Sequence, residues 1–63
     1  MGYKIREVRE EHGMSQVELA EKSGVSRATI SALENGTLRS TMTSTLEKIA
    51  HALGVSMNDI FFN

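Results

Sequence analysis

The stretch GVSRATISALENG, residues 24–36 of this 63-residue chain, has side chains that are unusual for a helix surface. Steps of about 100° per residue place Ile30 and Leu33 on one side of a helix. The residues on the opposite side are small and uncharged: Ala28, Ser31, Ala32 and Asn35. Such a face can approach closely in the major groove of DNA, where alanine methyls contact thymine methyls. The alternative is an ordinary surface whose alanines are there for helix propensity.

A three-residue linker, Gly24-Val25-Ser26, separates this helix, expected at about 27–35, from one expected at about 16–23. So short a turn forces a steep crossing, the helix-turn-helix arrangement. A steep crossing needs a small residue at the contact, which Ala20 supplies. Glycine at 24 tolerates positive φ in the turn. Four apolar residues are expected to fill the wedge between the helices: Leu19, Val25, Ile30 and Leu33.

Helical periodicity and repeated Gly-x-Ser punctuation extend along the whole chain, and no stretch alternates like a strand. We expect an all-α, five-helix bundle with helices at about 3–12, 16–23, 27–35, 43–53 and 57–62. Val17 and Ala20 recur at helical spacing as apolar positions of the second helix. Ser15 with Glu18 and Ser56 with Asp59 fit capping boxes. Three residues are candidate caps for the fourth helix: Thr41, Thr43 and Ser44.

Length and composition indicate one domain, residues 1–63, without cysteines and with 40% hydrophobic residues. The sequence shows no membrane span and no signal peptide, which favours a soluble, cytoplasmic protein. A net charge of −1 argues at first against a nucleic-acid partner. The acidic residues, however, concentrate in 7–21, whereas 26–45 has two arginines and one glutamate. Charge therefore neither supports nor excludes DNA binding.

The segments SQVELAEKSGVSRATISALENG and TLEKIAHALGVSMNDIFF resemble the XRE family, the Cro and phage-repressor type of helix-turn-helix domain. The resemblance covers nearly the whole chain and implies a lambda-repressor-like fold. It also implies binding to operator DNA, usually as a dimer, and regulation of transcription. The helix at about 27–35 would be the recognition helix.

The resemblance assigns roles residue by residue. Gln16 matches the position that holds a DNA phosphate, and the base-reading positions are matched by Arg27, Ala28, Ser31 and Ala32. Ser26, Thr37 and Arg39 match positions near the DNA backbone, and we add Asn35 and Ser40 as phosphate candidates. The sequence departs from some phage repressors, which carry glutamine at 28 and 32, and from members with proline near Thr41. Arg27 and Ser31 are thus the main polar readers.

Two charged residues fall on inward-facing helix positions. Arg9 shares a side with Ile5 and Val8, and Glu34 neighbours Ile30 and Leu33. An unpaired buried charge is costly, so we expect an ion pair between Arg9 and Glu34. The XRE family has a matching pair. The alternative is that each side chain extends separately to water.

Catalysis and metal binding have no support in the sequence. His12 and His51 lack companions at ligand spacing, and we see neither a nucleophile–base pair nor a phosphate-binding glycine loop. The sequence therefore predicts no enzyme, no metal, no cofactor and no small-molecule ligand.

Phe62 is the large apolar residue left over once Met57, Ile60 and Phe61 cover one helix face. It either folds back onto the core or marks a homodimer interface. The leading hypothesis is a sequence-specific transcriptional regulator, with repression as its expected action, that binds a palindromic operator in double-stranded DNA as a dimer. The alternative is an antitoxin-type or other protein-interaction module that reuses this fold.

Overall fold

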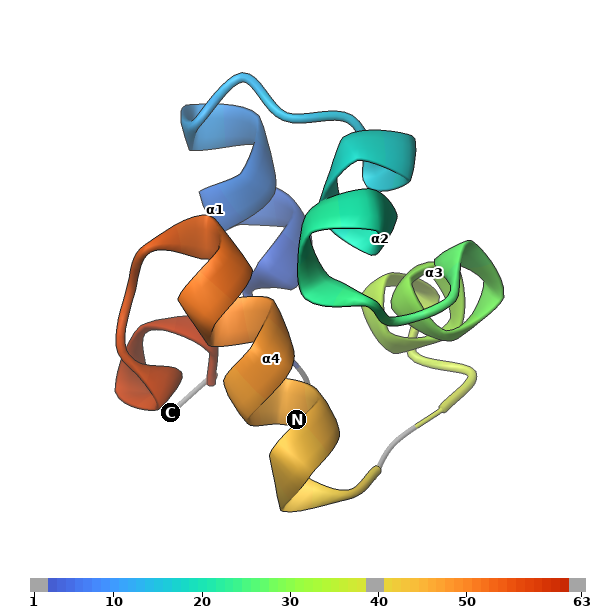
Figure 1. Ribbon diagram of the computed structural model, residues 1–63. Helices are drawn as coiled ribbons and strands as arrows, with labels where there is room; N and C mark the ends of the chain where they lie inside the picture. Colours follow the sequence, from blue (N-terminus) through green and yellow to red (C-terminus); the bar gives the residue numbers. More distant parts are fainter. Residues whose placement is uncertain (1–2, 39–40, 62–63) are drawn as a thin grey trace.

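The computed structural model describes residues 3–38 and 41–61, which form four α-helices and one 3-10 helix (Figure 1). The helices are α1 (Ile5–Glu11), α2 (Gln16–Ser23), α3 (Arg27–Asn35), α4 (Thr43–Leu53) and η1 (Met57–Ile60). The described ranges contain no strand, and one isolated antiparallel bridge joins Tyr3 to Phe61. The all-α prediction is confirmed, but the count of five helices in the bundle is not, because the last element is a 3-10 helix that ends at Ile60.

The last helix is a single 3-10 turn because the chain pairs with its own N-terminal segment. The Ser56–Asp59 capping box is present, and the Ser56 amide donates to Asp59 Oδ2 at 3.1 Å. Phe61 then takes extended backbone angles, and its ring lies 5.6 Å from that of Tyr3. The same pairing keeps Tyr3 out of α1, so this helix begins at Ile5 instead of residue 3.

The turn between α2 and α3 has the geometry that the sequence predicts. Gly24 adopts the left-handed conformation, with φ of 73°, and its amide donates to the Ala20 carbonyl at 2.9 Å. Ser26 then caps α3, because its Oγ accepts from the Thr29 amide at 3.2 Å. At the other end of α2, Ser15 and Glu18 form the expected capping box.

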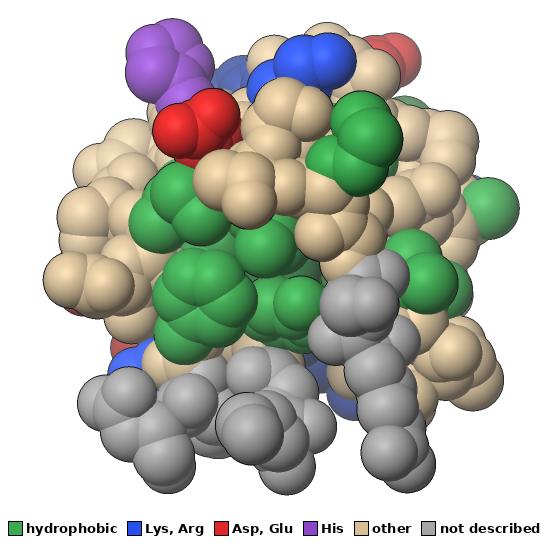
Figure 2. Space-filling model, turned by 90° about the horizontal axis from the view of Figure 1, so that it is seen from below, with side chains coloured by type: hydrophobic (Ala, Val, Ile, Leu, Met, Phe, Trp, Pro, Cys, Tyr) green, Lys and Arg blue, Asp and Glu red, His purple; other side chains and the backbone are tan. Residues whose placement is uncertain are grey.

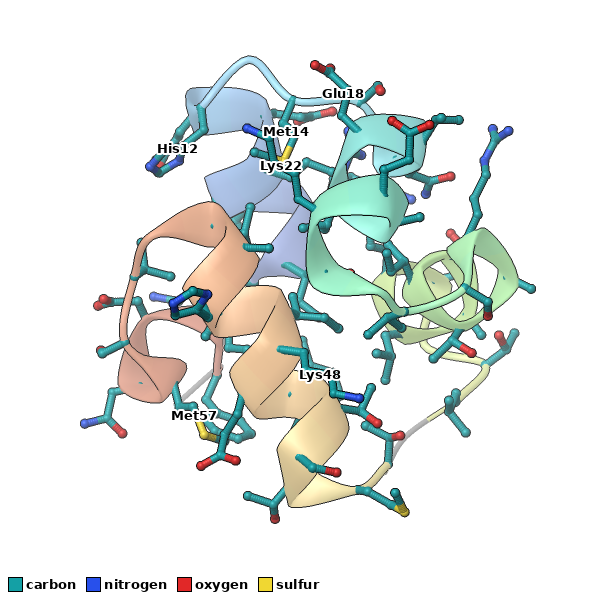
Figure 3. All side chains as sticks on the ribbon, in the orientation of Figure 1. His12, Met14, Glu18, Lys22, Lys48 and Met57 are labelled. Carbon is teal, nitrogen blue, oxygen red and sulfur yellow. The ribbon has the colours of Figure 1, made fainter. Side chains whose placement is uncertain are left out.

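One hydrophobic core joins all the helices. The four wedge residues, Leu19, Val25, Ile30 and Leu33, are buried, together with Ile5, Val8, Leu46, Ile49, Ala50, Leu53 and Ile60. α2 packs on both α3 and α4, while α1 packs on α3 and η1. Met14 packs between α1 and α2 (Figure 3). α3 is thus supported from two sides.

Two expectations about individual residues are wrong. Val17, expected at an apolar position, is 45% exposed, since α2 presents Leu19 to the core. α4 begins after Met42, which supplies no side-chain cap, and none of Thr41, Thr43 and Ser44 takes that position. Met42 itself is 68% exposed. Across the described ranges, no helix is long and apolar enough to cross a membrane.

Candidate nucleic-acid interface

The outer face of α3 is open to solvent and bears no exposed carboxylate. Arg27, Ala28 and Asn35 are exposed, while Ser31 and Ala32 are partly exposed. Glu34, the one acidic residue of α3, has a side chain with no exposed area. The face therefore combines small side chains with one exposed arginine, Arg27.

Glu34 is turned inward onto Arg9 of α1, as the sequence predicts. Arg9 Nε donates to Glu34 Oε2 at 2.8 Å and Arg9 Nη2 donates to Glu34 Oε1 at 3.1 Å. Arg9 Nη1 also donates to the Met14 carbonyl at 2.8 Å. The bidentate geometry locks α3 to α1 and to the loop before α2.

Two further donors that the sequence did not indicate also reach Glu34. Arg6 Nε lies 3.3 Å and Gln16 Nε2 lies 3.0 Å from Glu34 Oε1. Burial by itself would raise the pKa of the Glu34 carboxyl, but the hydrogen bonds from Arg9, Gln16 and Arg6 outweigh it and lower that pKa. The hydrogen bond to Glu34 raises the pKa of Arg9. Both groups are therefore charged at neutral pH.

Gln16 connects this network to the exposed face. Its Oε1 accepts from Arg27 Nε at 3.4 Å, while its Nε2 is held by Glu34. Among the described residues, the terminal nitrogens of Arg27 have no hydrogen-bond acceptor, so they can reach another molecule. The first backbone amides of α2, Gln16 and Val17, lack acceptors within their helix, as at any α-helix N-terminus.

A second chain of hydrogen bonds runs along the edge of α3. Arg6 Nη2 donates to Asn35 Oδ1 at 3.0 Å, and Asn35 Nδ2 donates to Ser31 Oγ at 3.3 Å. The four-residue spacing of Ser31 and Asn35 is a signal readable in the sequence. Arg6 precedes Arg9 by about one helical turn, so the two arginines lie on neighbouring positions of one face of α1.

The remaining predicted site residues are placed as follows. Ser26 uses its side chain as the cap of α3, and the Thr37 hydroxyl donates to the Ala32 carbonyl at 3.3 Å. Arg39, Ser40 and Phe62 lie outside the described residues. Within the described part of the chain, no three His, Asp or Glu side chains gather as a metal site would require. His12 Nδ1 lies 2.8 Å from the Val8 carbonyl.

Comparisons with known proteins match this arrangement. A family model described as helix-turn-helix matches residues 5–60. An uncharacterized HTH-type transcriptional regulator of Methanothermobacter thermautotrophicus is 48% identical over 90% of this chain and 83% of its own length. The immunity repressor protein of Bacillus phage phi105 is 37% identical and SinR, an HTH-type transcriptional regulator of Bacillus subtilis, is 35% identical, each over 95% of this chain. The chain spans only 41% and 54% of those two proteins.

Proposed function

The chain belongs to the XRE family of helix-turn-helix domains, and we propose that it is a sequence-specific DNA-binding regulator of transcription. The matching family model is a helix-turn-helix and the relatives are named as a repressor and as transcriptional regulators, so this domain is not an enzyme. In the proposed complex, α3 enters the major groove while α1, α2 and α4 hold it in position. The expected action is repression.

The observation that carries the proposal is the burial of Glu34. DNA phosphates repel carboxylates, and α3 hides its one carboxylate completely against Arg9. What remains on the outer side is a row of small residues beside two cations, the exposed Arg27 and the half-exposed Arg6. An ordinary solvated helix face has no need of this separation of charges.

Arg27 is proposed as the principal base reader, together with Ala28, Ser31 and Ala32. Its terminal nitrogens can donate in parallel to guanine O6 and N7, the commonest specific contact in the major groove. The six phosphate contacts are proposed for the N-terminus of α2 and for the flanks of α3: Gln16, Ser26, Asn35, Thr37, Arg39 and Ser40. Gln16 has a second amide hydrogen left for this contact while it remains bonded to Glu34.

Replacing Arg27 by alanine tests the base-reading role. Arg27→Ala should lower affinity for the preferred site by about 1–3 kcal/mol and relax the preference at one guanine position. Arg39→Ala removes the same charge and is the matched control, since a phosphate contact should weaken binding on all sequences alike. Competition binding against duplexes with single base changes measures both. An Arg27→Ala protein with the wild-type order of preferences would contradict the role.

We further propose that the functional unit is a homodimer on a palindromic operator. One recognition helix reads few base pairs, too few to select a site among a genome's competing sequences. η1 and α3 lie on opposite sides of the molecule in Figure 1, so an interface near η1 leaves α3 free. Figure 2 views the molecule from below relative to Figure 1 and shows hydrophobic side chains gathered near the centre of that face, an arrangement suited to an interface. Phe62, directly after Phe61, is proposed to take part.

Introducing a charge at Phe62 tests the dimer. Phe62→Glu should give a folded monomer that loses cooperative binding to a palindromic site, because a carboxylate at an apolar interface is costly. Val17→Glu makes the same kind of change at an exposed apolar position of α2, an element outside the proposed interface, and should stay dimeric. Sedimentation of both variants and the wild type decides the matter. A wild type that remains monomeric at high concentration and binds one copy per site would exclude the dimer.

A further inference from the structure

From the hydrogen bonds at the edge of α3, we infer that Arg6 is a positioning residue that fixes Ser31 as a hydrogen-bond donor to DNA. The inference rests on the proposed function and adds a specificity to it. Ser31 is a partly exposed hydroxyl on the face proposed to meet base edges. A free hydroxyl both donates and accepts, so by itself it discriminates poorly between bases.

The first step is the orientation of the Asn35 side chain. The guanidinium of Arg6 has only donors, and its Nη2 lies 3.0 Å from Asn35 Oδ1. An amide turned the other way would point its own NH₂ at these donors. Arg6 therefore keeps Asn35 Oδ1 on the side of α1 and leaves Nδ2 to face along α3. Arg6 is itself held by Glu34 Oε1 at 3.3 Å.

The second step is the orientation of the Ser31 hydroxyl. Asn35 Nδ2 donates to Ser31 Oγ at 3.3 Å, which occupies an acceptor lone pair of that oxygen. Within the described residues, Ser31 Oγ donates to no acceptor. Its proton is therefore the part of the hydroxyl left for another molecule. Ser31 presents a donor, and the relay from Arg6 through Asn35 sets this polarity.

The consequence is a preference against one base. Guanine, adenine and thymine all present acceptors in the major groove, whereas cytosine presents only its N4 amino donor. A hydroxyl fixed as a donor meets another donor when it faces cytosine. A single net hydrogen bond corresponds to about a 2- to 12-fold change in affinity. Wild-type protein should disfavour cytosine opposite Ser31 by a factor of this size.

The experiment measures affinity for duplexes carrying each of the four bases at every position of the half-site. Ser31→Ala first identifies the position that Ser31 reads, where discrimination against cytosine should disappear. Arg6→Ala should weaken discrimination against cytosine at that same position, although the Arg6 side chain does not itself contact the base in the proposed complex. Lys4→Ala removes a neighbouring positive charge outside the relay and is the control, with the wild-type order of bases retained.

Asn35→Asp reverses the polarity of the relay and is the sharpest variant. A carboxylate only accepts, so Ser31 must donate to it and present lone pairs to the DNA. The base preference at the Ser31 position should then shift toward cytosine, whose N4 amino group can donate to the Ser31 lone pairs. Thr37→Asp adds the same charge at the same end of α3 and should reduce affinity without changing the order of bases. Circular dichroism of each variant confirms that it folds.

The outcomes separate this inference from the proposed function. If Arg6→Ala and Asn35→Asp both keep the wild-type order of bases at the Ser31 position, the relay is overturned while sequence-specific binding stands. A Ser31→Ala protein with unchanged preferences everywhere overturns it as well. A wild-type protein that discriminates among no duplexes, even at the Arg27 position, refutes the proposed function itself.

Discussion

Replacing Glu34 by alanine would remove the group that holds α3 on α1. The Glu34 side chain has no exposed area and accepts four hydrogen bonds, two from Arg9 and one each from Gln16 and Arg6. Its loss leaves the Arg9 side chain, only 11% exposed, without a carboxylate. Removing one partner of a buried pair costs about 3–5 kcal/mol.

That cost is large for so small a domain. At about 0.05–0.15 kcal/mol per residue, a chain of 63 residues has a free energy of unfolding of roughly 3–9 kcal/mol. Glu34→Ala should therefore leave the protein marginally folded or unfolded at room temperature. Urea unfolding followed by circular dichroism measures the change. Glu21→Ala, at an exposed helical glutamate, is the matched control and should change stability by no more than about 0.5 kcal/mol.

The cause of the destabilisation can be separated from the loss of packing. In the Glu34→Ala background, Arg9→Met should recover stability, because no charge is then left buried without a partner. Equal urea midpoints for Glu34→Ala and Glu21→Ala would refute the reasoning. So would a double variant less stable than Glu34→Ala alone.

Two further predictions concern the stability of the protein at acid pH and the turn between α2 and α3. Because the pKa of Glu34 is lowered in the folded protein from its ordinary 4.5, its contribution to stability is complete above that pH and lost as the pH falls through the folded value. The unfolding free energy of wild type should therefore fall on acidification more steeply than that of Glu34→Gln, and parallel acid profiles would contradict this. Gly24→Ala should cost about 1–2 kcal/mol, because Gly24 has a φ of 73°. No atom lies within 4 Å of an added Cβ, so the cost comes from the backbone conformation and not from a clash. Asparagine tolerates the left-handed conformation better than alanine does, so Gly24→Asn should cost less. Equal urea midpoints for the two variants would exclude backbone strain as the cause.

The helix-turn-helix was predictable because its determinants act over a few residues. Ser15 and Ser26 cap the helices that follow them, and Gly24 ends the helix before it, so the bounds of α2 and α3 match those expected. The inward charges Arg9 and Glu34 were recognisable because helical spacing places them beside apolar residues. Determinants that act over a few residues in this way can be recognised from the sequence alone.

The features that sequence reasoning missed depend on contacts between distant segments. η1 stops after one turn because Phe61 pairs with Tyr3, a residue near the other end of the chain. Local sequence signals around Phe61 do not indicate this partner.

 Arg6 reaches Glu34 and Asn35 only because α1 packs across α3. Val17 is exposed because the crossing of α2 on α3 and α4 turns Leu19 inward instead. Each of these outcomes is decided by how helices cross, and a single sequence carries little direct signal of that.

The most direct test of the central claim is selection of binding sites by the wild-type protein from a pool of duplexes with randomised sequence. The proposed function predicts enrichment of one motif with two inverted half-sites, their centres about 34 Å apart on one face of the DNA. Retention of all duplexes alike, or of none at low salt, would contradict sequence-specific binding by α3.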